Sequence, residues 1–296
     1  MKRLFSAIAV LSLSLAACAP AAVKPSKPFV ISAIPDQDPE KLNRLYGKLA
    51  EYLTGKLGFT VVYQPVTDYT AVTNAFKTGD IDAVWFGGLT GVQARLEVPG
   101  SQAILQRDID ATFHSVFIVN TASGIAPFQD QSGLSALKGR TLTFGSDTST
   151  SGRLMPQFYM SKAGVQLTDL KGEVGFSGSH DKTIKLVEAG TYEAGALNEQ
   201  VWEARSKAGE VDLKKVQLVW RTPEFFDYHW IVRPDTDTKY GAGTTQKFKQ
   251  ALLDLTVDVA AQKDILDLFG AKKFIETKND NYKDIEAVGR AIGKIK

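Results

Sequence analysis

Short apolar runs alternate with longer segments of helical spacing along most of this chain. Residues 29–34 have the pattern of a buried strand, and leucines recur at helical spacing over residues 40–57 until Gly58 ends the segment. Further strands are expected at residues 60–66, 81–88, 103–106, 115–119, 140–144, 174–176, 194–197, 216–220 and 230–232. Such alternation predicts an α/β fold with mostly parallel sheets.

The strands and helices form two blocks, and in each block the strand ends carry glycine and hydroxyl residues. Ligands of open α/β sheets bind beyond the carboxyl ends of the strands, so two such blocks predict two lobes that face each other across a cleft. Hydrophobic residues make up 44% of the chain, which is enough for a substantial core in each lobe.

The first residues have the composition of an export signal. A basic start, Lys2 and Arg3, precedes an apolar core that is too short to span a bilayer as a permanent helix. The only cysteine, Cys18, follows directly in a setting similar to a bacterial lipobox; the alternative is an unpaired buried cysteine. We therefore expect a signal peptide over residues 1–17 and a lipidated, flexible tether over residues 18–28. The protein would then lie in the periplasm or at the cell surface, anchored to the membrane by lipid alone.

Charge and composition exclude several classes of protein. Without Lys2 and Arg3, 33 basic residues stand against 33 acidic residues, so the mature chain is formally neutral. The sequence has no long basic run, which argues against nucleic-acid binding. It has no His, Cys, Asp and Glu cluster with metal-ligand spacing, so neither a metal nor another cofactor is expected. One cysteine allows no internal disulfide, and any affinity for anions must come from a local site.

A cluster of hydroxyl residues, Ser149, Thr150 and Ser151, stands between an expected strand at residues 140–144 and a helix-like run. At a helix N-terminus the first backbone N–H groups lack intrahelical partners and the helix dipole is positive. Such an end binds anions, and three hydroxyl groups beside it add neutral donors for a tetrahedral oxyanion. The alternative is an ordinary helix cap, for which one of the three residues would suffice.

Other candidate residues stand at element ends. His180 falls at an expected helix start, where its imidazole and free backbone donors would converge on a ligand; the alternative is an exposed cap residue. Tyr69 begins a helix and could bind a ligand or simply pack. Phe86 ends a strand and could belong to the cleft wall or to the core. We expect His114 and His229 to be structural.

With these residues in place, the chain resembles the phosphonate/phosphite class of periplasmic substrate-binding proteins of ABC importers, from about residue 29 onward. The more specific motifs are Ser149-Thr150-Ser151-Gly152 and Ser179-His180-Asp181; weaker ones are Asp68-Tyr69, residues 83–87 and Asp227 within residues 225–228. A closer likeness is to a subgroup described as selenate-binding, through residues 106–107, 113–117, 151–156, 196–199 and 227–230.

The resemblance implies the type II fold of two-lobed periplasmic binding proteins, with a mixed, mostly parallel sheet in each lobe and two crossover strands. Lobe 1 would comprise residues 29–118 and 231–296, and lobe 2 residues 119–230. The resemblance further implies a monomer that captures a small tetrahedral oxyanion, of the phosphonate or phosphite type or selenate. Its partners would be the permease and ATPase subunits of an ABC importer.

In the family, the hydroxyl cluster and the histidine grip the PO3 group, aromatic residues close the site, and carboxylates recognise what the phosphorus carries. Carried over residue by residue, the implied ligand-binding residues are Tyr69, Phe86, Ser149, Thr150, Ser151, His180, Asn198 and Asp227. The chain departs from the family pattern twice. Phe86 stands where tyrosine is usual, so a hydroxyl donor is lost, and Asn198 or Glu199 stands where a second carboxylate is expected.

Asp227 decides which ligand fits. An ionised carboxylate only accepts hydrogen bonds and repels a bare dianion. If Asp227 faces the ligand, the ligand must carry a proton or a cationic tail, as hydrogenphosphite, phosphate monoanion or an aminophosphonate does. If Asp227 instead pairs with an arginine, fully ionised selenate becomes acceptable.

A rival reading is an exported serine hydrolase that uses Ser149 or Ser151 with His180. The chain has no Gly-x-Ser-x-Gly elbow, and His180 follows the serines too closely for the late base of that fold. We therefore expect a binding protein and not an enzyme, with two lobes closing around one anion.

Overall fold

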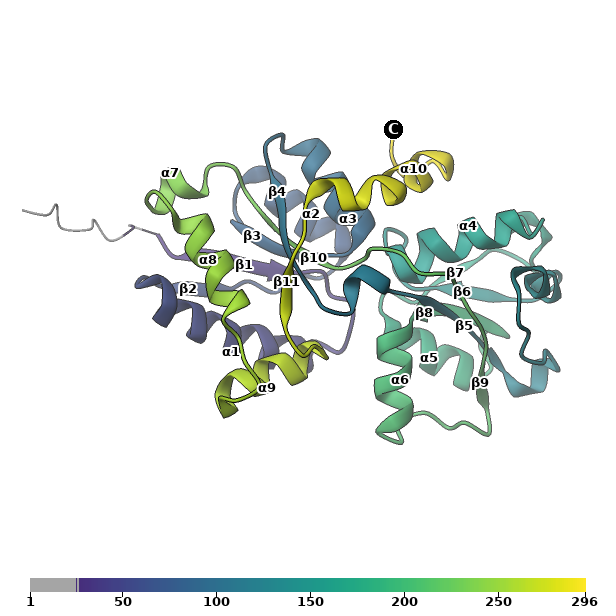
Figure 1. Cartoon of the computed structure of the whole chain (residues 1–296). Coiled ribbons are helices and arrows are strands. Elements are labelled where there is room, and N and C mark those ends of the chain that lie inside the picture. The colour runs from purple at the N-terminus through teal and green to yellow at the C-terminus, as the bar shows by residue number, and fades with distance from the viewer. Residues whose placement is uncertain (1–24, 26) are drawn as a thin grey trace, which may run out of the picture.

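The protein has two lobes, each built on one β-sheet (Figure 1). This computed structural model describes residue 25 and residues 27–296. The expected signal peptide, Cys18 and most of the expected tether therefore lie outside the described residues. Within the part of the chain that is described, no helix combines the length and the apolar character needed to cross a bilayer.

The sheet of lobe 1 has six strands. They are β1 (Phe29–Ala33), β2 (Val61–Tyr63), β3 (Ala83–Phe86), β4 (Gln102–Arg107), β10 (His229–Val232) and β11 (Phe274–Glu276). Their order across the sheet is β11-β4-β10-β3-β1-β2. The strands β1, β2 and β3 pair in parallel, whereas β10 runs antiparallel between β3 and β4, and β11 runs antiparallel to β4.

The sheet of lobe 2 has five strands. They are β5 (Ser115–Asn120), β6 (Leu142–Phe144), β7 (Gly175–Phe176), β8 (Ala194–Asn198) and β9 (Val216–Arg221), in the order β7-β6-β8-β5-β9. The strands β6, β7 and β8 pair in parallel, and β5 is antiparallel to both of its neighbours. Both sheets are therefore mixed, and the expected parallel pairing is confirmed for three strands of each.

The chain passes between the lobes twice, through residues 108–114 and 222–228. Phe113 and Phe225 hold these two segments together through a pair of 2.9 Å backbone hydrogen bonds. The expected divisions after residues 118 and 230 are corrected, because each falls inside a strand: β5 pairs only within the sheet of lobe 2, and β10 pairs only within that of lobe 1. A strand's own sequence does not encode which sheet it joins.

Caps at the expected positions define the helices of lobe 1. The Asp38 and Asp68 carboxylates accept backbone N–H groups at the starts of α1 and α2, and Gly58 and Gly79 end these helices in the left-handed conformation. The helices are α1 (Pro39–Leu57), α2 (Tyr69–Thr78), α3 (Gly88–Glu97), α4 (Met155–Lys162), α5 (His180–Glu188), α6 (Glu199–Lys207), α7 (Thr236–Tyr240), α8 (Thr244–Leu253), α9 (Ala260–Phe269) and α10 (Lys283–Ala291). Strand β11 is not among the strands expected from the sequence.

Helix α3 approaches β10 so closely that one position must be glycine. A Cβ atom added at Gly91 would lie 2.3 Å from His229 Nε2 and 3.0 Å from Ile231 Cδ1, and both of these side chains are fully buried. We predict that Gly91→Ala lowers the free energy of unfolding by about 1–3 kcal/mol, because the overpacked side chains must shift. Urea denaturation of the purified protein measures this.

Gly47→Ala is the matched control. Gly47 lies within α1, and nothing stands within 4 Å of an added Cβ atom there. This change should leave stability unchanged or raise it by up to about 1 kcal/mol. A Gly91→Ala protein as stable as the control would contradict the close approach of α3 to β10.

Candidate functional site

The loop after β6 folds the hydroxyl cluster into a buried turn. Gly145 N–H donates to the Gly152 carbonyl (2.9 Å), and Ser149 Oγ accepts from Gly152 N–H (3.0 Å). Ser149 is the cap of the segment that follows, and all three hydroxyl residues are buried. The expected helix N-terminus is present, but its first turn (Thr150–Leu154) is π-helical and α4 begins only after it.

The N-terminus of α3, in lobe 1, meets this loop. Its first backbone N–H groups donate outward: Gly88 N–H to Asp227 Oδ1 (2.8 Å) and Leu89 N–H to Thr150 Oγ1 (2.9 Å). Gly87, the cap residue, leaves room for both side chains, since a Cβ atom there would lie 3.2 Å from Thr150 Oγ1 and 3.3 Å from Asp227 Oδ1. Residues from lobe 1, lobe 2 and a crossover segment therefore converge at the positive end of one helix dipole.

Asp227 keeps one carboxyl oxygen free. Its Oδ2 atom is buried and has no hydrogen-bond partner among the described residues. Burial raises the pKa of Asp227 to about 7, against the lowering effect of the Gly88 N–H and of the Ser151 and Thr150 hydroxyl groups. Near neutral pH this group can therefore either accept a hydrogen bond as a carboxylate or donate one as an acid.

Tyr69 supplies a second free polar atom. Its hydroxyl group is buried and has no hydrogen-bond partner among the described residues. Burial raises the pKa of Tyr69 well above its ordinary value, with Asp36 acting in the same direction and the nearby Ser149 side chain against it. The hydroxyl thus stays protonated and can donate to an anion.

Among the residues that the structure describes, no cationic side chain bonds directly to the hydroxyl cluster. Arg153, the nearest arginine in sequence, places its guanidinium over the rings of Phe144 (4.4 Å) and Phe176 (5.4 Å) and beside Asp147 (3.6 Å). Any anion bound at Ser149–Ser151 would thus be held by neutral donors and helix dipoles.

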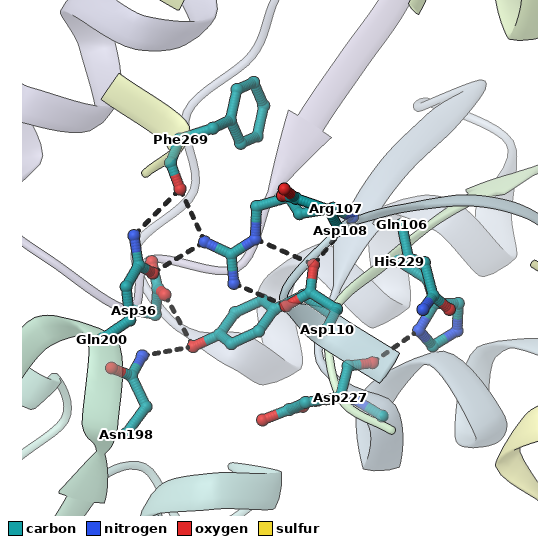
Figure 2. Close-up of polar contacts among 12 residues, drawn as sticks. Asp36, Gln106, Arg107, Asp108, Asp110, Asn198, Gln200, Asp227, His229 and Phe269 are labelled. Atoms are coloured by element: carbon teal, nitrogen blue, oxygen red, sulfur yellow. Dashed lines mark hydrogen bonds and ion pairs between the residues drawn. The ribbon is translucent and has the colours of Figure 1, made fainter. Parts of the chain in front are cut away.

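His180 and Asn198 belong to a second buried network, which joins the lobes through Tyr228. The Tyr228 hydroxyl donates to Asp36 Oδ2 (2.8 Å) and accepts from Asn198 Nδ2 (2.9 Å). Figure 2 shows Asp36 and Asn198 pointing toward each other from opposite lobes. His180 Nε2 lies 3.2 Å from the same hydroxyl, and its Nδ1 accepts from Asn198 N–H (3.3 Å), so the ring proton belongs on Nε2.

Burial sets the charges in this network. It lowers the pKa of His180 to about 4 and raises the pKa of Asp36 to about 6, so the imidazole is neutral at physiological pH. Asn198 also caps α6 by accepting from Val201 N–H (2.7 Å). The polar atoms of these two predicted ligand residues, His180 and Asn198, are therefore engaged by protein groups.

Phe86 and the remaining histidines have packing roles in the structure. Phe86 is fully buried and meets Phe76 edge to face (5.6 Å between ring centroids). His229 Nδ1 lies 2.9 Å from the Asp227 carbonyl oxygen, which orients that residue (Figure 2), and His114 Nδ1 lies 2.6 Å from the Thr222 carbonyl oxygen. The expectation that both histidines are structural agrees with these contacts.

Two contacts at the lobe interface were given no role from the sequence, that of Tyr228 with Asp36 and the ion pair of Arg107 with Asp110. Arg107 donates to Asp110 through Nε (2.8 Å) and Nη2 (2.6 Å), and its Nη1 reaches Gln200 of lobe 2 (2.7 Å). The signal in the sequence was the likeness to the selenate-binding subgroup, which includes residues 106–107 and 227–230.

The family model described as "ABC transporter, phosphonate, periplasmic substrate-binding protein" matches residues 31–282. The chain belongs to this family. It is 45% identical over 271 residues, 91% of each chain, to a probable ABC transporter phosphite binding protein, PhnD1, of Prochlorococcus marinus (strain MIT 9301). It is 26% identical over 174 residues to the phosphonates-binding periplasmic protein of Escherichia coli (strain K12), covering 57% of this chain and 49% of that protein.

Solved structures agree with this assignment. The structure of PhnD1 from Prochlorococcus marinus in complex with methylphosphonate superposes with a TM-score of 0.89 and covers 91% of this chain and 99% of that one. A phosphonate-transporter binding protein from Pseudomonas aeruginosa, 17% identical, shares the fold with a TM-score of 0.76, covering 90% of this chain and 85% of that one. The chain is thus a periplasmic substrate-binding protein of a phosphonate/phosphite ABC transporter, with the expected type II fold.

The comparisons give the serine hydrolase alternative no support. In the structure, both ring nitrogens of His180 face groups other than the serines.

Asp227→Asn should change how stability depends on pH. An unfolded aspartate titrates near pH 3.8, whereas the folded carboxyl titrates near pH 7, so the folded protein binds more protons between these values. The contribution of Asp227 to the free energy of unfolding therefore falls as the pH rises from about 4 to about 7. The free energy of unfolding of Asp227→Asn, taken relative to that of wild type, should therefore rise by on the order of 1–4 kcal/mol between pH 5 and pH 8.

Urea denaturation at the two pH values measures this difference. Asp36, whose carboxyl pKa is also raised, is present in both proteins, so its effect cancels in the comparison. A difference between the two proteins that is the same at pH 5 and pH 8 would contradict a buried, protonatable Asp227.

Proposed function

We propose that this protein captures one compact oxyanion of the phosphonate or phosphite type between its lobes and delivers it unchanged to the membrane subunits of an ABC importer. One observation carries the proposal. Two buried polar atoms without hydrogen-bond partners among the described residues lie next to the hydroxyl cluster: the Tyr69 hydroxyl near Ser149, and Asp227 Oδ2 in a carboxyl group near Thr150 and Ser151. Buried polar groups are normally hydrogen-bonded, and these two free atoms stand beside a hydroxyl cluster and a helix N-terminus, where a bound oxyanion would satisfy them.

The donors suit a tetrahedral anion. Tyr69 would donate from lobe 1, Ser149, Thr150 and Ser151 from lobe 2, and Asp227 from the crossover segment. Binding by residues of both lobes would close the cleft around the ligand. Of the predicted ligand residues, His180 and Asn198 would then act through the Tyr228 network, and Phe86 through packing.

Asp227 favours a ligand that can carry a proton. Among the described residues no arginine or lysine forms an ion pair with Asp227, and its carboxyl instead accepts from Gly88 N–H. When Asp227 is ionised, a phosphonate, phosphite or phosphate can still share its own proton with the carboxylate. Fully ionised selenate or sulfate has no proton to share and would bind only if Asp227 is itself protonated, which becomes rarer as the pH rises above about 7. The methylphosphonate complex of the PhnD1 relative supports the first group, and the selenate reading remains the alternative.

We propose the same cellular context that the sequence predicts. Lipidation at Cys18 would tether the protein to the membrane, and it would act as a monomer with permease and ATPase partners. It would bind without catalysis, since its relatives are binding proteins.

The double substitution Ser149→Ala plus Thr150→Ala tests the proposed function. Each hydrogen bond to a charged ligand contributes about 1.5–3 kcal/mol, so affinity for methylphosphonate or phosphite should fall by about 10²- to 10⁴-fold. Calorimetric titration measures the affinity, and a thermal-shift screen that includes phosphate, sulfate, selenate and selenite identifies the preferred anion.

Ser161→Ala is the matched control, because this hydroxyl lies in α4 of the same lobe and bonds only to the Phe158 carbonyl oxygen (2.8 Å). It should bind like wild type, and both variants should melt cooperatively without ligand. Unchanged affinity in the double variant would refute the proposed site.

A further inference from the structure

The loop that carries the hydroxyl cluster also carries a carboxylate that the proposed site does not use. Asp147 stands two residues before Ser149, and both of its oxygens accept from Lys294 Nζ at 2.7 Å. Arg153 Nε lies farther away, at 3.6 Å. Lys294 is thus the principal counter-charge of Asp147.

Lys294 belongs to lobe 1 and is fixed there by its backbone. It follows α10, its N–H donates to the Gly289 carbonyl oxygen (2.7 Å), and its own carbonyl oxygen accepts from Gln93 Nε2 of α3 (2.9 Å). Figure 1 shows α10 reaching from lobe 1 toward α4 of lobe 2. In the same helix α3, Leu89 N–H donates to Thr150 Oγ1. Lobe 1 therefore bonds to the loop at two residues, Asp147 and Thr150.

We infer that Lys294 is an affinity-determining positioning residue, which holds the anion-binding loop against lobe 1 without touching the ligand. This inference rests on the proposed function. Asp147 and Lys294 lie on different lobes, so their ion pair forms when the cleft shuts and breaks when it opens. The pair also balances a negative charge next to the site of an anionic ligand, which would otherwise be repelled.

The loss of ligand affinity expected on removal of Lys294 can be estimated from the solvent exposure of its ion pair with Asp147. The Lys294 side chain is 21% exposed and that of Asp147 is 52% exposed. Pairs of this kind couple weakly and are screened by salt, so removal of Lys294 should weaken affinity by about 1.5- to 5-fold at low ionic strength. The change should appear in the dissociation rate, since the pair acts after the lobes close.

A double-mutant cycle tests this with methylphosphonate as the probe. Wild type, Lys294→Met, Asp147→Asn and the double variant are compared by stopped-flow and calorimetry at about 10 mM and 500 mM salt. We expect Lys294→Met to speed dissociation in the wild-type background, to have little effect when Asp147 is already asparagine, and to lose its effect at high salt.

Lys283→Met is the matched control, because Lys283 begins the same α10 and pairs with Asp280 within lobe 1 (3.0 Å). It should leave dissociation unchanged. If the effects of the two cycle substitutions are additive at low salt, or if Lys294→Met and the control release the ligand at the same rate, the inferred role of Lys294 is wrong. The proposed function would still stand in that case. A wild-type protein that binds none of the oxyanions would overturn the proposed function and this inference together.

Discussion

The 2.8 Å hydrogen bond from Gly88 N–H to Asp227 Oδ1 holds a buried carboxyl group at the positive end of α3, where both lobes and a crossover segment meet. Because the group is buried, its pKa rises to about 7, and because only one oxygen is bonded, the other is free. In its ionised form this carboxyl group disfavours a bare dianion and suits an anion that brings a proton, so the preference should sharpen as the pH rises above about 7. The ligand preference we propose depends on this one interaction.

The closed arrangement is stabilised around that group by contacts that need no ligand. Tyr228 is the residue after Asp227. Its hydroxyl group contacts Asp36 of lobe 1 and both Asn198 and His180 of lobe 2. On the other side of the loop, Leu89 N–H bonds to Thr150. In the proposed function, the ligand would therefore have to supply only part of the free energy that keeps the lobes together.

Sequence analysis predicted every strand in the described residues except β11, since the spacing of apolar residues and helix-ending signals such as Gly58 act locally. It also predicted that Tyr69, the hydroxyl cluster and Asp227 would share a site, through a family resemblance rather than through spacing. The sheet to which β5 and β10 belong could not be predicted, because partner choice is a tertiary property. The same holds for the Tyr228 network, whose members come from segments far apart in the chain.

The most direct test of the shared proton is calorimetric titration with methylphosphonate at about pH 8.5, repeated in buffers of different ionisation enthalpy. A carboxylate at Asp227 and a dianionic ligand cannot both stay ionised in a buried site, so binding to wild type should take up protons from the buffer. The uptake should disappear in the Asp227→Asn protein. Tight binding to wild type with no proton exchange would contradict our account of how Asp227 selects the ligand.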